Sequence, residues 1–337
     1  MSCASTERIT ADTTRLVQER LKRSADFRAT GDFHQLSFQA MSTLCRVNFR
    51  TPDNALARRL QNEVLEWVGG FEARYSRFIA DSLISRINDA AGKHWVEIDA
   101  ETDALFRFCQ DMFLFTQGVF DPTALPLLRL WNWKARPPVV PAPAAVQAAR
   151  QWVGWGKVQR RPGAVFLPER GMGLDLGGVG KEYAVDRALW LILEAGVQDV
   201  LVDFGQDVRV HGRPPSGEAW HIGLQDPKDL ARCWTGVAVT NHAVATSGDV
   251  ARFFVHNGRR YGHILDPRTG CPVDNGSLSV SVIASHCTVA GILSTTAFVL
   301  GPVEGIQLIS RCPGAEGCVI TNSTRHQTRG FYAYTTS

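Results

Sequence analysis

The chain has 337 residues, of which 45% are hydrophobic, and a formal net charge of +3. This length is enough for one large domain or two ordinary ones with a sizeable core. The small net charge and the dispersed lysines and arginines argue against nucleic acid as the main partner, and no apolar run is long enough to span a membrane.

Targeting and redox signals point to the cytoplasm. The first 14 residues are polar and lack the basic and apolar regions and the cleavage site of a secretory signal. The eight cysteines lack Cys-x-x-Cys spacing, which fits reduced thiols better than a disulfide framework or a zinc site. Cys312 and Cys318 flank a turn and would be able to pair in an oxidising compartment. We therefore expect a cytoplasmic protein with free cysteines.

The beginning of the chain is predicted to form a helical extension, residues 1–36, ahead of a main domain of residues 37–337. The extension contains a charged amphipathic helix over residues 10–29, in which Leu16 and Leu21 are sparse apolar points. We expect this helix to pack either on the domain or on a partner.

The main domain contains strands in hairpin-like pairs as well as strands that alternate with helices. This mixture favours the α+β class over a doubly wound sheet. Asp81–Ser82 is interpreted as the cap of a short helix rather than as a phosphate contact. The expected strands cover residues 37–51, 199–203, 208–212 and 278–284, and the expected helices cover residues 54–69, 103–117, 145–153 and 288–300, with a further helix that ends at Ala195.

The most informative stretch runs from Gly173 to Ala188. A short apolar strand is expected to end in a glycine turn, residues 177–180, and the following helix carries Lys181 in its first turn. Glycines let backbone N–H groups surround a ligand, and a helix N-terminus adds partial positive charge, so the turn suits a phosphate. The spacing is neither Gly-x-Gly-x-x-Gly nor that of a P-loop. A structural turn and a phosphate cradle therefore both stay open.

Other polar residues have two interpretations each. His263 lies in a dense polar turn, where an imidazole would suit general base catalysis at neutral pH or would be structural. Asp121 and Asp266 precede prolines and either fix turns or serve a site. Asp186 either caps a helix, pairs with Arg187 or serves a site.

Taken in order, the polar motifs resemble those of the ApbE family, the FAD:protein FMN transferases. The resemblance covers the chain from about Phe38 to its C-terminus. It implies an ApbE-like flavin transferase fold, with mixed, largely antiparallel sheets flanked by helices. The matching motifs are Met41-Ser-Thr43, Ser76 to Asn88, Phe120-Asp-Pro-Thr123 with Pro126 and Trp131, Asp175-Leu-Gly-Gly-Val-Gly-Lys181, Tyr183-Ala-Val-Asp186-Arg187, Gly205-Gln-Asp207, Thr246-Ser-Gly-Asp249 and His263-Ile-Leu-Asp266-Pro-Arg-Thr-Gly270.

The resemblance implies that FMN is moved from FAD to a threonine or serine hydroxyl of an acceptor protein, with release of AMP. It implies that His263 is the general base, and that Lys181 with the glycine turn holds the diphosphate. Such a reaction needs the phosphates held, their charge neutralised and the hydroxyl oriented. The residues implied to bind FAD are Met41, Asp121, Gly177, Gly178, Lys181, Asp186, Thr246 and Asp266.

The metal site departs from the family pattern. The family helix Ala-Asp-Ala-Leu-x-Thr supplies an aspartate and a threonine to magnesium, together with a backbone carbonyl of the glycine turn. Here Thr295 and the Gly180 carbonyl remain as the implied ligands, but Gly291 stands in place of the aspartate. Magnesium favours a carboxylate, so the site would need water, a neighbouring acid or no metal. Restoring the acid by Gly291→Asp is therefore expected to strengthen magnesium dependence.

A second departure is Glu182, which follows Lys181 where the family has glycine. Its carboxylate would either pair with Lys181 and weaken phosphate binding, or replace the missing metal ligand. Three functions follow: a flavin transferase, a catalytically impaired FAD-binding or scaffold homologue, and a hydrolase that splits FAD into FMN and AMP. The retained His263 and Thr295 favour an enzyme, whereas the missing acid favours a scaffold.

Overall fold

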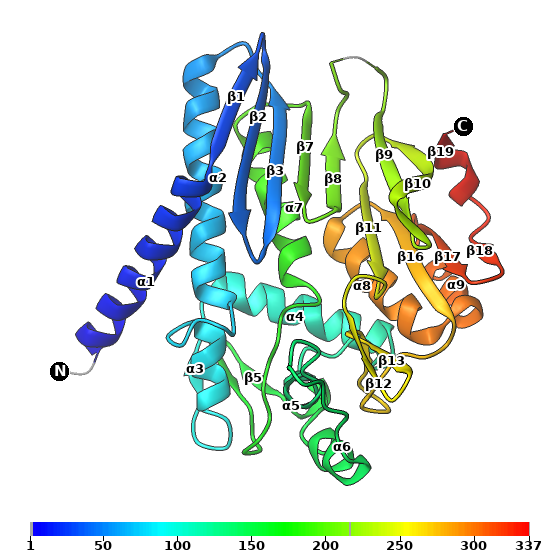
Figure 1. Cartoon of the computed structure of the whole chain (residues 1–337). Helices are drawn as coiled ribbons and strands as arrows, with labels where there is room; N and C mark the ends of the chain where they lie inside the picture. Colours follow the sequence, from blue (N-terminus) through cyan, green and yellow to red (C-terminus); the bar gives the residue numbers. More distant parts are fainter. Residues whose placement is uncertain (1–2, 216, 337) are drawn as a thin grey trace.

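The computed structural model describes residues 3–215 and 217–336. Within these residues, nine strands form one sheet in the order β1-β2-β3-β7-β8-β11-β16-β17-β18, and each pair of neighbouring strands is antiparallel (Figure 1). The predicted α+β class is confirmed. The sheet consists of β1 (Asp26–Thr30), β2 (Phe33–Ala40), β3 (Thr43–Arg50), β7 (Val200–Phe204), β8 (Asp207–His211), β11 (Ala243–Gly248), β16 (Ser277–Ala284), β17 (Glu316–Thr321) and β18 (Arg325–Gln327).

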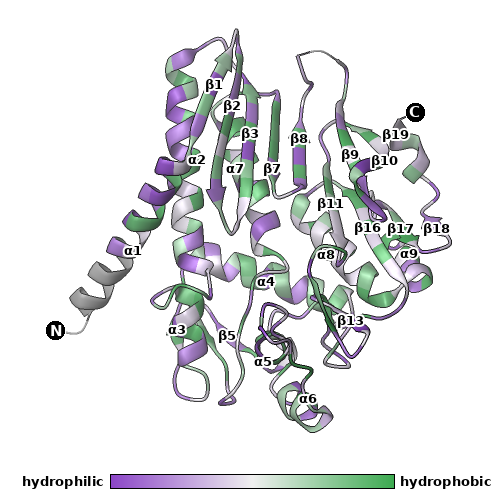
Figure 2. Ribbon diagram, viewed as in Figure 1, coloured by the Kyte–Doolittle hydropathy of each residue, from purple (hydrophilic) through white to green (hydrophobic). Residues whose placement is uncertain are grey.

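Helices cover one face of this sheet. The main core lies between the sheet and α2, α7, α8 and α9, and α8 is mainly white to green in Figure 2 because most of its side chains are apolar. The α-helices are α1 (Cys3–Ser24), α2 (Asn54–Tyr75), α3 (Leu83–Asp89), α4 (Ala100–Phe115), α5 (Leu125–Leu130), α6 (Pro143–Arg150), α7 (Gly180–Glu194), α8 (Cys287–Leu300) and α9 (Pro302–Ser310).

Smaller sheets complete the structure. The sheet β19-β10-β9 covers the other face of the large sheet and encloses a second apolar cluster that contains Val210, Val244 and Ile283. A third cluster packs the β12–β13 hairpin against α5 and α6. The remaining elements are β4 (Val96–Glu97), β5 (Gln159–Arg161), β6 (Ala164–Phe166), β9 (Trp220–Asp226), β10 (Asp229–Val239), β12 (Phe253–His256), β13 (Arg259–Gly262), β14 (Leu265–Asp266), β15 (Cys271–Pro272), β19 (Thr335–Thr336), and the 3₁₀ turns η1 (Trp155–Lys157) and η2 (Phe331–Tyr334).

The predicted strand over residues 37–51 is wrong, because this segment is the end of β2 and the whole of β3. The two strands meet in a two-residue turn in which Met41 and Ser42 have φ values of 49° and 60°. Such a turn normally carries asparagine or glycine, and the sequence has neither here. The local pattern therefore gave no sign of the reversal.

The predicted end of a helix at Gly69–Gly70 is also wrong, since α2 continues to Tyr75. Gly69 faces α1, and a Cβ atom on it would lie 2.7 Å from the Gln18 Cγ atom. The glycine therefore allows α1 and α2 to pack closely instead of ending the helix.

The helix predicted for residues 10–29 covers residues 3–24, and the chain then enters β1 at Asp26. Leu21 of α1 is fully buried in the main core, and the Thr13 hydroxyl donates to Asp81 at 2.6 Å. The predicted domain boundary at residue 36 falls inside β2, so the large sheet includes strands from both sides of it.

Among the described residues, no helix is long and apolar enough to cross a membrane. The cysteines from Cys45 to Cys318 are free, and Cys312 and Cys318 are not joined.

The turns β2–β3 and β7–β8 touch each other at one end of the sheet. The Gly205 amide donates to the Leu44 carbonyl at 3.1 Å, and a Cβ atom on Gly205 would lie 2.4 Å from the Thr43 Oγ1 atom. Gly205 also has a φ of +63°. Its backbone geometry and its close neighbour therefore both require glycine.

We expect Gly205→Ala to lower the free energy of unfolding by about 2 kcal/mol or more, because strain at positive φ adds to a clash with Thr43. Urea unfolding followed by circular dichroism measures this loss. The control is Gly258→Ala, where φ is +75° but no atom lies within 4 Å of the added Cβ. Equal losses in the two variants would contradict the importance of the turn contact.

Candidate functional site

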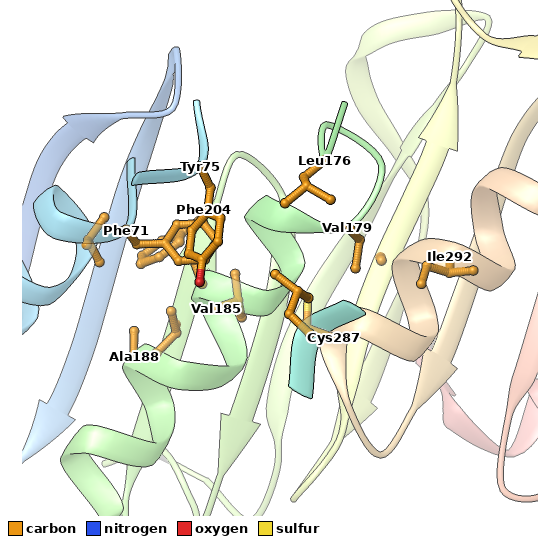
Figure 3. Close-up of a cluster of buried hydrophobic side chains, with 14 of the residues drawn as sticks. Phe71, Tyr75, Leu176, Val179, Val185, Ala188, Phe204, Cys287 and Ile292 are labelled. Carbon is orange, nitrogen blue, oxygen red and sulfur yellow. The ribbon is translucent and has the colours of Figure 1, made fainter. Parts of the chain in front are cut away.

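The glycine turn, residues 177–180, is fixed by its apolar members. Leu176 and Val179 are buried in the core, and Figure 3 shows them among its packed side chains with Cys287 and Ile292 of α8 nearby. Gly177 and Gly178 are exposed. The buried residues thus hold the turn while the backbone of the two glycines stays accessible.

The strand expected just before this turn is absent from the described structure. Residues 173–176 have no strand neighbour, and the Asn88 side chain pairs with them instead. Its amide donates to the Leu174 carbonyl at 3.0 Å, and its carbonyl accepts from the Leu174 amide at 2.6 Å. One side chain therefore replaces a neighbouring strand, which a local pattern does not reveal.

The helix α7 starts without a side-chain cap. Val179 is at the cap position, and no described side chain accepts from the first-turn amides. A Cβ atom on Gly178 would have only the Phe120 ring near it, at 3.9 Å, so there is space above this glycine. The Gly180 amide donates to the Leu176 carbonyl and the Gly177 amide to Asp175, each at 2.6 Å. The helix dipole and the next amides of the first turn are what favour an anion at such a place. The local geometry fits a phosphate.

Lys181 lies in this first turn and forms ion pairs with two acids. Its Nζ atom contacts the Asp207 carboxylate closely and is 3.4 Å from the Glu182 Oε1 atom. Asp207 is the first residue of β8 and follows the Gly205–Gln206 turn directly. The lysine therefore lies at the end of the sheet where the β2–β3 and β7–β8 turns meet, and this end also carries Met41.

The helix α8 brings Thr295 to the same end. Asp186 of α7 accepts from the Cys287 amide of α8 at 2.8 Å, and Glu182 of α7 lies against Gly291 of α8. Because residue numbers fall along α7 as they rise along α8, the two helices run antiparallel. One more helical turn places Thr295 level with the glycine turn.

Ser247 of β11 fixes the Thr295 side chain. The Ser247 hydroxyl lies 2.7 Å from the Thr295 Oγ1 atom and 2.8 Å from the Ser294 Oγ atom. Thr246, the residue expected to bind FAD, points to the other face of the sheet, where its Oγ1 atom lies 2.8 Å from Ser281 Oγ. Asp207 and Ser247 are therefore site residues that the sequence analysis did not select, although both lie in the quoted motifs.

His263 is connected to β11 through the segment that follows this strand. Asp249 binds the Arg260 guanidinium through both carboxylate oxygens, each at 3.0 Å. The His263 amide and Nδ1 atom lie 3.1 and 3.2 Å from the Arg252 carbonyl. A carbonyl only accepts, so Nδ1 carries the proton and Nε2 keeps its lone pair.

The surroundings of His263 favour the neutral imidazole. Burial, followed by the positive charge of Arg252, lowers the pKa of His263 from 6.5 to about 4. The imidazole is therefore neutral near pH 7, and its Nε2 atom is able to accept a proton.

The three predicted aspartates hold turns and helices. Asp121 accepts from Thr123 and from the Trp155 amide at 3.1 Å, and burial raises its pKa. Asp266 pairs with Arg268 at 2.9 Å. These contacts match the turn-fixing interpretation, and a direct contact of either residue with FAD stays a prediction.

Asp186 joins α7 to α8 and β8. One oxygen accepts from the Arg209 guanidinium at 2.9 Å and the Cys287 amide at 2.8 Å, and the other accepts from the amide and hydroxyl of Thr288. It caps α8, one of the interpretations that the sequence left open, and it pairs with Arg209 rather than with Arg187. These contacts within the protein do not test whether Asp186 also contacts FAD, so that contact stays a prediction.

The predicted site residues do not line the groove beside α1 and α2. A groove of about 720 Å³ lies between α1 and α2, and its lining includes Gln18, Arg74 and Asp99 but none of the predicted site residues. The candidate site is instead an open arrangement at the end of the large sheet.

The chain is similar in sequence and in structure to known proteins. The model of the ApbE family matches residues 41–319. A FAD:protein FMN transferase of Treponema pallidum is 30% identical over 297 residues, which cover 83% of this chain and 82% of the relative. One from Vibrio cholerae is 28% identical over 275 residues, or 80% and 82% of the two chains.

Two solved structures have the same fold. The ApbE protein of Thermotoga maritima has a TM-score of 0.82 and 30% sequence identity, and the match covers 90% of this chain and all of that one. The flavin transferase ApbE of Vibrio cholerae has a TM-score of 0.81 and 25% identity, with coverages of 92% and 99%.

Proposed function

Because this chain belongs to the ApbE family, we propose that it is an FAD:protein FMN transferase that moves FMN from FAD to a threonine or serine of an acceptor protein. The observation that carries the proposal is the arrangement at the start of α7. There, exposed glycines, an uncapped helix and Lys181 meet at one end of the sheet. These groups suit the diphosphate of FAD.

The proposed reaction is a transfer at the FMN phosphorus. The acceptor hydroxyl oxygen forms a bond to this phosphorus, the phosphorus–oxygen bond to AMP breaks, and AMP leaves with the bonding electrons. The Nε2 atom of His263 takes the hydroxyl proton and passes it to water. The Lys181 side chain and the amides of residues 181 and 182 neutralise the charge that develops on the phosphate oxygens.

The residues present fit a magnesium ion. Thr295 and the Gly180 carbonyl are the predicted ligands, and the Glu182 Oε2 atom is buried with no hydrogen-bond partner among the described residues. No cluster of three acidic, histidine or cysteine residues occurs there in the described chain, but magnesium commonly takes one or two carboxylates together with substrate phosphates. When bound, the ion supplies charge neutralisation to the diphosphate.

The direct test is incubation of the purified protein with FAD, magnesium and an acceptor domain. We expect a covalently fluorescent acceptor and an equal amount of AMP. FAD binding without labelling or AMP would instead show a scaffold, and AMP without labelling would show a hydrolase. Flavin fluorescence during titration reports the binding step separately.

The pH dependence follows from the lowered pKa of His263. Since kcat/KM reports groups of the free enzyme, we expect its acidic limb at a pH of about 4 rather than 6.5, because only below this value is the imidazole protonated. Substrate phosphates favour the imidazolium, so the limb of kcat is expected at a higher pH. Rates measured from about pH 3 to pH 9, with circular dichroism at each pH to verify that the protein is folded, test this. A limb at 6.5 in kcat/KM would contradict the environment described for His263.

We also propose that the protein is located in the cytoplasm, the compartment expected from the sequence. Its support is a set of buried thiols, including those of Cys45 and Cys318, whose pKa values are raised by burial to about 12. Such inert thiols suit a reducing compartment. Cell fractionation followed by immunoblotting tests the location.

A further inference from the structure

Glu182 occupies the space that a side chain at position 291 would need. A Cβ atom added to Gly291 would lie 2.5 Å from the Glu182 Cγ atom, 3.1 Å from Cδ and 3.3 Å from Oε1. Carbon atoms do not approach to 2.5 Å without displacement. A side chain at position 291 would therefore force the Glu182 side chain to move from its present position.

The Glu182 carboxylate is only partly satisfied in this position. The residue is 7% exposed, and its Oε1 atom lies 3.4 Å from the Lys181 Nζ atom. The Lys181 ammonium is closer to Asp207, and the Glu182 Oε2 atom is buried without a hydrogen-bond partner among the described residues. A buried carboxylate oxygen is costly unless something binds it, so Oε2 has a vacant bonding capacity.

The Glu182 side chain lies against the face of α8 that carries Thr295. Gly291 and Thr295 are four residues apart and share one face of the helix. The Thr295 hydroxyl is fixed by Ser247 at 2.7 Å, and the antiparallel packing places it level with the glycine turn. The Glu182 carboxylate and the fixed Thr295 hydroxyl thus lie on one face of α8, at the end where the glycine turn lies.

We propose that Glu182 supplies, from α7, the carboxylate ligand of a Mg²⁺ ion that Thr295 also binds. This inference rests on the proposed function in one respect, because the diphosphate of FAD supplies the remaining ligands of the ion. Magnesium prefers hard oxygen ligands and needs few carboxylates when phosphates are present. The sequence left two roles open for Glu182: a pair with Lys181, or a replacement for the missing metal ligand. The weak contact with Lys181 and the unpartnered Oε2 atom favour the second role.

The same contact changes the expectation for Gly291→Asp. Without a change at position 182, the new side chain would meet Glu182, so the single variant is expected to lose stability rather than gain magnesium dependence. The exchange variant Glu182→Gly with Gly291→Asp removes the clash and returns the acid from α8. The exchange variant, rather than the single variant, therefore tests how an acid at position 291 affects magnesium binding.

The test measures Mn²⁺ binding, as a paramagnetic substitute for Mg²⁺, by electron paramagnetic resonance in the presence of FAD. We expect Glu182→Gln to weaken Mn²⁺ binding at least tenfold, and the exchange variant to bind more tightly than Glu182→Gly alone. The control is Glu194→Gln, an exposed acid at the other end of α7, which should bind Mn²⁺ as the wild type does. Thermal unfolding establishes that each variant is folded.

Unchanged Mn²⁺ affinity in folded Glu182→Gln would overturn the proposal, and so would an exchange variant that binds no better than Glu182→Gly. If Glu182→Gln does not fold, the Mn²⁺ affinity of the exchange variant is compared with that of Glu182→Asp, and this comparison decides whether Glu182 binds the metal. Acceptor labelling by the wild type is measured in parallel. If the acceptor is labelled but metal binding does not depend on Glu182, only this inference is refuted. If metal binding depends on Glu182 but neither labelled acceptor nor AMP appears, only the proposed function is refuted.

Discussion

Replacing His263 by alanine is expected to lower kcat for acceptor labelling by about 10²–10⁴-fold, the usual contribution of a positioned general base. The Nδ1 atom faces the Arg252 carbonyl, so Nε2 is the nitrogen that is free to take the hydroxyl proton. Flavin binding should change little, because the imidazole acts on the acceptor and not on the diphosphate. Initial rates of labelling and flavin fluorescence titrations measure the two effects separately.

The matched control for this variant is His211→Ala. His211 is the last residue of β8, whereas Asp207, which contacts Lys181, is the first, so the control histidine lies at the opposite end of the strand. The control should label the acceptor at the rate of the wild type. A His263→Ala enzyme with an unchanged kcat would show that another group accepts the proton.

The second large effect is expected for Asp186→Ala, which should lower the free energy of unfolding by about 3–5 kcal/mol. The substitution leaves the Arg209 guanidinium buried without its carboxylate and removes the acceptors of the Cys287 and Thr288 amides. Urea unfolding measures the loss. Asp186→Asn keeps the shape and is expected to lose less.

The same pair of variants decides between the two interpretations of Asp186. A structural role predicts a large loss of stability, and FAD affinity in folded Asp186→Asn close to that of the wild type. A loss below about 1 kcal/mol combined with much weaker FAD binding would show that the aspartate contacts the nucleotide instead.

The order and chemistry of the motifs were sufficient to predict the fold class, whereas the site residues stay a prediction. Ser82 caps α3 by accepting from the Ser85 amide at 3.0 Å, as its position before an apolar run predicted. The helix expected over residues 288–300 is α8, which begins one residue earlier. In these segments, local preferences and the tertiary structure agree.

Long-range contacts explain what the sequence did not predict. The partners of Asp186 on α8 lie 101 and 102 residues further along the chain. Gly69 interrupts no helix because Gln18 packs against it, and Met41 turns the chain without a turn residue. Likewise, the relation between Glu182 and Gly291 is visible only when two helices are side by side. Each of these features depends on a neighbour that no local pattern contains.

The steric exclusion between Glu182 and Gly291 also constrains how this site arose. A chain that starts with an acid on α8 and gains glutamate on α7 is overfilled, and one that first loses the α8 acid has no carboxylate there. Either single step is therefore expected to cost stability or metal affinity, and we expect the two positions to change together. Homologous sequences should fall into two groups, one with each arrangement, and intermediates should be scarce.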